Sequence, residues 1–240
     1  MEFALEVQNI SFRIDHREIF QGLSLSLRKG EAYFLLGASG SGKSLFLKIC
    51  AGLLTPQKGK VTIGMVDLAL AGKDALREVR AKIGFVFQDS ALISNMAIYD
   101  NVALPLRYHQ RWNEDEVRAR VEQKLALFGV DRALDRSIPA HLSMEMRKRA
   151  ALARALVLEP EILLLDHPTD GLGAEEEQTI GRILRDYQQR IGASLLEVGS
   201  EWPHSSFQPD RVGFLRDGRI ATEGTAEEIQ DHLAKRTKKD

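Results

Sequence analysis

Residues 37–44 have the composition of a loop that binds phosphate groups. They read Gly-Ala-Ser-Gly-Ser-Gly-Lys-Ser and follow an apolar stretch, residues 32–36, that predicts a buried strand. Glycines let backbone N–H groups approach a phosphate closely, the lysine can reach the β- and γ-oxygens, and the last serine can ligand Mg²⁺. We therefore expect this segment to bind a nucleoside triphosphate. The residues expected to contact it are Gly37, Ala38, Ser39, Gly40, Ser41, Gly42, Lys43 and Ser44.

The order of the predicted elements indicates an α/β domain with an inserted helical block. Residues 3–36 contain short runs of alternating apolar and polar side chains, a pattern typical of half-buried antiparallel strands. A helix over 45–51 should follow the glycine-rich loop, with its N-terminal dipole facing the phosphates. Residues 89–158 favour helices almost throughout. Strands and helices alternate again from residue 162 to a C-terminal helix that begins near Thr225.

Composition limits the classes of partner. The chain has 240 residues, enough for one sizeable core. Its 33 basic and 34 acidic residues balance, so the charge does not indicate a nucleic-acid partner. The longest apolar run, 162–165, is far too short to span a bilayer, and we expect any membrane association to pass through another protein. The single cysteine, Cys50, and an N-terminal segment without a secretion signal favour a cytoplasmic location.

Several motifs resemble those of ATP-binding cassette (ABC) proteins, in the same order along the chain. The glycine-rich loop corresponds to the Walker A motif, and the apolar segment 161–166, which ends in Asp166, resembles Walker B. Phe87-Gln88 resembles the Q-loop, and residues 142–156 resemble the signature motif and its helix. Residues 53–59, 214–220 and 224–229 also resemble ABC segments. The resemblance covers essentially the whole chain.

This resemblance implies a fold class and a domain organisation. The class is α/β, an ABC ATPase P-loop core whose mixed sheet carries an antiparallel β part, together with an inserted α-helical subdomain. Residues 1–240 would form one nucleotide-binding domain. Within it, residues 1–88 and 159–240 would form the core, and residues 89–158 would form the helical subdomain with the signature motif.

The same resemblance implies ligands and partners. ATP and Mg²⁺ would bind, with Ser44, Gln88 and Asp166 around the metal. The partners would be transmembrane permease subunits and a second ATP-binding subunit, in a homodimer within the complex. The chain would then lie on the inner face of the cytoplasmic membrane.

Residues 87–107 indicate a subfamily. They are similar to the ATPase subunits of MCE-type lipid transporters, the Mla-like systems that move phospholipids between bacterial membranes. In ABC proteins the residues after the Q-loop face the coupling helix of the membrane subunit, so Val102, Leu104 and Leu106 could form an apolar docking patch. The same side chains could instead pack the helical block. An MCE substrate-binding protein would be a further partner of the complex, and amino-acid importers, which share part of the pattern, are an alternative.

Residues around the expected reaction centre depart from the family pattern. The family usually has a Glu as base after the Walker B Asp, whereas this chain has His167, a residue that can accept a proton but has a different reach. Ser200 stands in place of the switch histidine and cannot offer a cation to the γ-phosphate. The D-loop, residues 171–173, lacks its usual Asp. Ile14 replaces the aromatic side chain that stacks on adenine, and Phe12 alternates to the other strand face, where we expect it in the core.

The signature motif is altered as well. Two glycines normally let backbone N–H groups at a helix start approach the γ-phosphate across the dimer interface, and here Met144 and Glu145 follow Ser143. A carboxylate about 5 Å from a phosphate charge would cost on the order of 3 kcal/mol at an effective dielectric of about 20. That cost falls if the Glu145 side chain turns away, and a Glu at a helix start is otherwise favourable. The basic run 147–149 predicts a solvated surface that faces another subunit.

Two functions of different classes follow from these motifs. The chain is either the energising ATPase of a lipid transporter with unusual hydrolytic residues, or a structural or regulatory subunit that closes on ATP and scarcely cleaves it. The glycine-rich loop and Asp166 are intact, while four other motifs depart from the pattern. This combination favours retained ATP binding with weak or absent hydrolysis. A translation-factor type of ABC protein would need two cassettes in one chain, and the sequence contains one.

Overall fold

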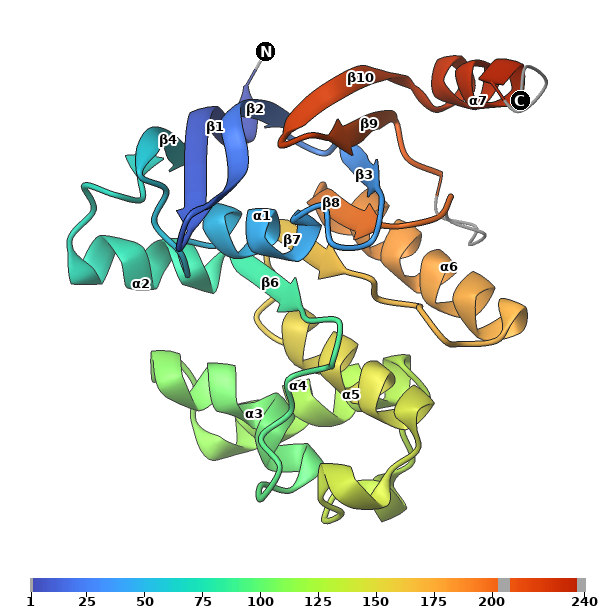
Figure 1. Ribbon diagram of the computed structural model, residues 1–240. Helices are drawn as coiled ribbons and strands as arrows, with labels where there is room; N and C mark the ends of the chain where they lie inside the picture. The colour runs from blue at the N-terminus through green and yellow to red at the C-terminus, as the bar shows by residue number, and fades with distance from the viewer. Residues whose placement is uncertain (1, 203–207, 237–240) are drawn as a thin grey trace.

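The computed structural model describes residues 2–202 and 208–236, and the strands of these residues form two sheets (Figure 1). The antiparallel sheet has the order β2 (Arg17–Arg28), β1 (Phe3–Ile14), β4 (Lys58–Ile63) and β5 (Val66–Asp67). The larger sheet has the order β10 (Arg219–Thr225), β9 (Arg211–Arg216), β3 (Ala32–Gly37), β8 (Ser194–Gly199), β7 (Ile162–Asp166) and β6 (Ile83–Val86). Its neighbouring strands are parallel except for β10 and β9. The predicted α/β class with an antiparallel part is confirmed.

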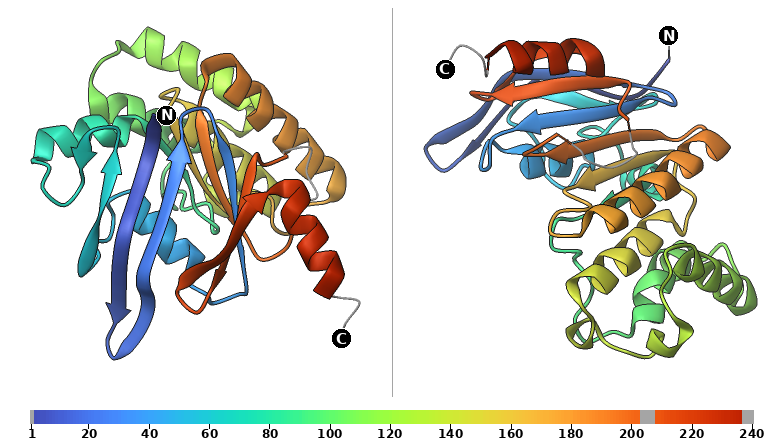
Figure 2. Two further views of the ribbon diagram at one scale, coloured as in Figure 1. Left: turned by 90° about the horizontal axis from the view of Figure 1, so that it is seen from above. Right: turned by 90° about the vertical axis from the view of Figure 1, so that its right-hand side faces the viewer.

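The helices fall into two groups. Four accompany the strands: α1 (Lys43–Cys50), α2 (Lys73–Ala81), α6 (Ala174–Ile191) and α7 (Ala226–Arg236). The others follow β6 and precede β7 in the chain: α3 (Ile98–His109), α4 (Glu114–Leu127) and α5 (Met144–Leu156), with 3-10 turns at Arg132–Leu134 and Pro139–His141. Figure 1 and the right-hand view of Figure 2 show this second group as a block below the sheets. No helix in the described part of the chain combines the length and the apolar character of a membrane span.

Polar caps define where the helices of this block begin. The Asn113 side chain accepts hydrogen bonds from the backbone N–H groups of Asp115 and Glu116, and the Glu116 carboxylate accepts one from the Asn113 N–H. This reciprocal capping box fixes the start of α4. Ser143 caps α5 in a simpler way, because its hydroxyl accepts a hydrogen bond of 3.2 Å from the Met146 N–H. The signature-like helix therefore starts directly after Ser143.

The larger sheet separates two hydrophobic clusters. Along β7, Leu163 and Leu165 face the cluster formed with α6 and the helical block, whereas Ile162 and Leu164 face the cluster formed with α1 and the antiparallel sheet. This alternation follows from the strand period of two. With both faces covered, ligands reach a parallel sheet at the carboxyl ends of its strands. In this fold the loops after β3, β7 and β8 meet at that edge.

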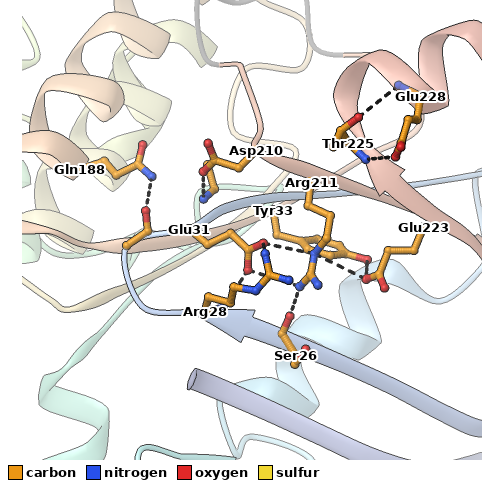
Figure 3. A network of polar contacts seen from close by, with 12 residues as sticks. Ser26, Arg28, Glu31, Tyr33, Gln188, Asp210, Arg211, Glu223, Thr225 and Glu228 are labelled. Carbon is orange, nitrogen blue, oxygen red and sulfur yellow. Dashed lines mark hydrogen bonds and ion pairs between the residues drawn. The ribbon is translucent and has the colours of Figure 1, made fainter. Parts of the chain in front are cut away.

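A polar cluster joins the sheets near the start of β3 (Figure 3). The Arg211 side chain is 15% exposed, and its Nε lies 3.2 Å from Oε1 of Glu31 and 3.8 Å from Oε1 of Glu223. Its guanidinium also donates to the Ser26 carbonyl on β2 and stacks 4.9 Å above the centre of the Tyr33 ring. The Tyr33 hydroxyl donates to Glu223 at 2.7 Å, and burial raises the pKa of Tyr33 well above its usual value. Strands β2, β3, β9 and β10 are thus held at one point.

Candidate nucleotide-binding site

Residues 37–42 form a tight turn between the buried strand β3 and helix α1. Gly40 and Gly42 have φ angles of 75° and 101°, in the left-handed region that favours glycine. A Cβ atom on Gly42 would lie 2.8 Å from Cγ2 of Ile19, so a side chain does not fit there. The buried Ser41 hydroxyl has no hydrogen-bond partner within the described structure. Because an unpaired buried hydroxyl is costly, this orphan fits a loop that receives oxygen atoms of a ligand.

The Lys43 ammonium lies inside this loop. It is 4% exposed, and its Nζ donates to the carbonyls of Gly37 at 2.7 Å and Ala38 at 3.0 Å and to the Ser200 hydroxyl at 3.2 Å. Burial lowers the pKa of Lys43, while the nearby Asp166 raises it. The ammonium is therefore held by weak neutral acceptors at a place where phosphate oxygens would bind it more strongly.

Ser44 and Asp166 form a pair beside the loop. The Ser44 hydroxyl donates to Oδ1 of Asp166 at 3.0 Å, and Asp166 is 3% exposed. Burial raises the pKa of Asp166, and the hydrogen bond from Ser44 opposes that shift. A hydroxyl and a carboxylate oxygen at this spacing fit Mg²⁺, which prefers oxygen ligands. Gln88, the third predicted metal ligand, is exposed after β6, and no hydrogen bond or ion pair among the described residues joins it to this pair.

His167 follows this pair and is restrained from two sides. Its φ angle is 49°, an unusual value for a residue other than glycine, and it is 7% exposed. Nδ1 lies 2.6 Å from Oδ2 of Asp170, a close contact without the alignment of a hydrogen bond. The Lys148 ammonium donates to the His167 carbonyl at 2.9 Å. Asp170 and Lys148 were not predicted as site residues.

The predicted solvated surface at 147–149 is wrong for two of its three residues. Lys148 is 4% exposed because its ammonium reaches the carbonyls that follow β7, and burial lowers the pKa of Lys148. The Arg149 side chain is 14% exposed and contacts Glu145 and Glu176. A run of basic residues on a helix necessarily points in several directions, since successive side chains are about 100° apart.

A cavity of about 370 Å³ opens beside His167 and is lined by Asp170, Glu177, Glu197 and Ser200 among others. Glu197 is 6% exposed, and burial, together with the charges of Asp170 and Glu177, raises the pKa of Glu197 to about 8. This shift favours the protonated form of the carboxyl near neutral pH. The sequence held a signal for it, because Glu197 is the one charged residue in the otherwise apolar and small-residue stretch 194–199.

Ile14, the residue expected near adenine, lies apart from the cleft beside the glycine-rich loop. Ile14 ends β1 and is 42% exposed, whereas Phe12 is 8% exposed and lies in the core against Phe20, as predicted. A cleft of about 670 Å³ opens beside residues 38–41 and reaches the turn at Asp217. Ile14 is not among its lining residues.

The signature residues do not reach the glycine-rich loop of their own chain. Ser143 caps α5, and Oε1 of Glu145 lies 3.0 Å from Nε of Arg149. Within the described residues, no hydrogen bond or ion pair links Ser143 or Glu145 to residues 37–44. One chain thus brings the loop, Asp166, His167 and Ser200 together, and keeps the start of α5 separate.

The apolar residues after Gln88 divide between core and surface. Val102 and Leu106 have no exposed surface and belong to the core of the helical block, so their predicted use as a docking patch is wrong. Leu104 is 38% exposed, and Tyr108, further along α3, is 63% exposed. The difference follows from helix geometry, since residues four apart share one face and residues two apart do not.

Comparisons with known proteins find a matching family and similar ATP-binding proteins. Residues 20–170 match the family described as ABC transporter. A probable ribonucleotide transport ATP-binding protein, mkl, of Mycobacterium bovis is 38% identical over 215 residues, which cover 90% of this chain and 60% of that protein. The sulfate/thiosulfate import ATP-binding protein CysA of Xylella fastidiosa is 36% identical over 228 residues, covering 94% of this chain and 64% of that protein. The chain spans about three fifths of the length of these relatives.

Solved structures give the same result for the fold. The dimeric structure of the ATP-binding cassette MJ0796 bound to ADP and Pi aligns with a TM-score of 0.86 and 29% identity, covering 92% of this chain and 98% of that one. The structure of cbiO1 from Clostridium perfringens, part of the ABC transporter complex cbiONQ, aligns with a TM-score of 0.82 and 27% identity, covering 96% and 92%. With the family match and these relatives, the chain belongs to the ABC transporter family as an ATP-binding domain.

Proposed function

We propose that this chain is the ATP-binding subunit of a bacterial ABC transporter of the MCE/Mla type, in which ATP binding and dimer closure drive a permease for phospholipids. The observation that carries ATP binding is the convergence of Lys43, Ser44 and Asp166 beside an intact glycine-rich loop. The ammonium can bind phosphate oxygens, and the hydroxyl and carboxylate can hold Mg²⁺. ATP and Mg²⁺ are the usual ligands of the family.

We assign roles to the remaining site residues from their positions in the ABC-like motifs. Residues 37–44 would hold the phosphates, and Gln88 would complete the Mg²⁺ site by moving from its exposed position. His167 and Ser200 would lie near the γ-phosphate, and Ile14 would give adenine a weak apolar contact. Ser143 and Glu145 would approach the nucleotide of a second subunit.

The separation of the glycine-rich loop from the start of α5 within one chain supports a dimer of this kind, because each part would need the other from a second copy. The similar cassette MJ0796 is described as dimeric with ADP and Pi. We propose a homodimer in which the start of α5 in one copy faces the glycine-rich loop of the other. We further propose that the domain divides into a core, residues 1–88 and 159–240, and a helical subdomain, residues 89–158.

A groove between the core and the helical block is the proposed docking surface for the permease. It has a volume of about 380 Å³, and its lining includes Ile83, Phe85, Leu104, Tyr108 and Arg154. In ABC proteins the residues after the Q-loop face a coupling helix, and this groove is lined by residues of β6, which ends two residues before Gln88. The chain would thus lie on the inner face of the cytoplasmic membrane, and an MCE substrate-binding protein would join through the complex.

The lipid assignment rests on the similarity of residues 87–107 to MCE-type ATPases. The names of the relatives mention ribonucleotide and sulfate or thiosulfate transport, and an amino-acid-type importer is the alternative for this chain. The test is to purify the chain together with its permease and to identify the bound small molecules by mass spectrometry. Phospholipid enriched over a detergent blank supports the proposal. A bound amino acid, with no such enrichment, contradicts it.

A nucleotide-binding regulatory subunit is the second candidate function. It is favoured by the position of Ser200, whose hydroxyl accepts from Lys43 and offers no cation, and by His167 at the position of the usual base. Both candidates require ATP binding, and turnover separates them. Stoichiometric Mg-ATP binding without phosphate release, in the complex with its permease, would support the regulatory function.

A further inference from the structure

The two side chains that replace the signature glycines lie against their own chain. Oε1 of Glu145 is 3.0 Å from Nε of Arg149, which lies one helical turn further along α5. Cε of Met144 lies over Gly171, where an added Cβ would come within 2.8 Å of it. Arg149 thus lies on the C-terminal side of Glu145, and it draws the Glu145 carboxylate away from the first turn of α5.

Arg149 is itself fixed by groups on three helices. Its side chain is 14% exposed, and Nη1 donates to the Phe128 carbonyl, at the end of α4, at 2.7 Å. Nη2 forms an ion pair with Glu176 on α6. Gly129 leaves room for this arrangement, because a Cβ there would lie 2.6 Å from Nη1. These contacts fix the position of the Arg149 guanidinium, so the Glu145 side chain has to turn toward it to form the ion pair.

Without Arg149, the Glu145 carboxylate would prefer a different position. The first N–H groups of a helix have no intrahelical acceptor, and an acidic side chain in the first turn can fold back onto them. Glu145 would then occupy the groups that a phosphate would use and would also repel it.

We infer that Arg149 is a positioning residue that holds the Glu145 carboxylate away from the start of α5, so that this helix start can face the γ-phosphate bound by a second copy of the chain. This inference rests on the proposed function, because it assumes an ATP-dependent dimer. It concerns dimer formation and not turnover. It therefore applies whether or not ATP is cleaved.

The experiment is a double-mutant cycle read out by analytical ultracentrifugation of the full chain in Mg-ATP. Arg149→Met should weaken the ATP-dependent dimer at least tenfold. The same change in a Glu145→Gln background should weaken it less than threefold, because the charge that needs holding is gone. Arg147→Met removes a cation from the same helix and is the matched control, with equal effects in both backgrounds. Thermal melts check that each variant is folded.

A weakening by Arg149→Met that is equal in both backgrounds would give Arg149 a merely structural role and overturn the inference. Glu145→Gln alone tests it without altering Arg149: dimer affinity within threefold of wild type is expected, and a gain of tenfold or more would show that Glu145 blocks the interface despite Arg149. If no variant dimerises although all bind Mg-ATP, the proposed dimer fails and the inference falls with it. If ATP-dependent dimers form but the effect of Arg149→Met on them does not depend on Glu145, the inference alone is overturned and the proposed dimer stands.

Discussion

Nδ1 of His167 lies 2.6 Å from Oδ2 of Asp170. The side chain that we propose to lie near the γ-phosphate therefore faces a carboxylate of its own loop. A Glu at position 167 would bring two carboxylates together, and like charges at such a distance oppose each other strongly. His167 and Asp170 are thus close neighbours, and a substitution at position 167 changes what the Asp170 carboxylate faces.

Turnover should respond to this pairing. We expect slow or undetectable ATP turnover, and His167→Glu alone should restore little because Asp170 opposes the new carboxylate. Combining His167→Glu with Ser200→His, Met144→Gly and Glu145→Gly should raise the rate far more than the single changes suggest, since residues that act as a unit are non-additive. Adding Asp170→Ser should raise it further. Phosphate-release assays measure each rate.

One outcome would contradict this view of the site. Wild-type turnover of about 1 s⁻¹ or more, within the usual range of enzymes, that is abolished by His167→Ala would identify His167 as a working base.

Nucleotide binding should depend on Lys43. Replacing it with Ala removes the ammonium from the glycine-rich loop and leaves Gly37 and Ala38 carbonyls without their donor. We expect Lys43→Ala to abolish Mg-ATP binding in a titration with a fluorescent nucleotide. Equal affinity for wild type and variant would remove the basis of the proposed function. Lys48→Ala, five residues further along α1, is the control and should bind Mg-ATP as tightly as wild type.

The docking groove can be tested with two leucines on α3. Leu104→Glu places a charge at a position that is 38% exposed and should reduce co-purification with the permease while Mg-ATP binding stays unchanged. Leu106→Glu buries the same charge in the core and should prevent stable folding. Unchanged co-purification of the Leu104 variant would move the docking surface elsewhere.

Stability should depend on pH through Glu197. Its pKa is raised from 4.5 to about 8 in the folded chain, so between these values the folded state holds a proton that the unfolded state has released. Its contribution to the free energy of unfolding therefore falls as pH rises, by up to about 1.4 kcal/mol per pH unit. Glu197→Gln removes this dependence, and its gain over wild type should grow from pH 5 to pH 8.

Urea unfolding at several pH values measures this difference. Glu201→Gln, a change at an exposed neighbour, is the control and should follow the wild-type curve. Parallel curves for wild type and Glu197→Gln would show that Glu197 is ionised in the folded state.

The elements that carry the phosphate-binding loop could be predicted because local patterns determine them. An apolar strand, a glycine-rich turn and a helix follow one another at residues 32–51, and each has its own periodicity or composition. The cap at Ser143 is equally local. These features do not depend on which distant segment packs nearby.

The supporting residues could not be predicted, because their roles come from distant segments. Lys148 and Arg149 are part of a basic run, and only the folded chain shows that the first reaches the His167 carbonyl and the second reaches Glu176. Leu106 was misplaced for a related reason. The apolar residues of α3 do not indicate by themselves which face of the helix meets the core.

The Arg211 cluster ties the two sheets together near the start of β3. Opening β9 would take the guanidinium away from the buried Glu31 carboxylate and from the Ser26 carbonyl on β2. We therefore expect β2, β3 and β9 to open together. Backbone amides of these strands should exchange with deuterium at similar, slow rates, so the strand that carries the phosphate-binding loop is protected by a contact at its opposite end.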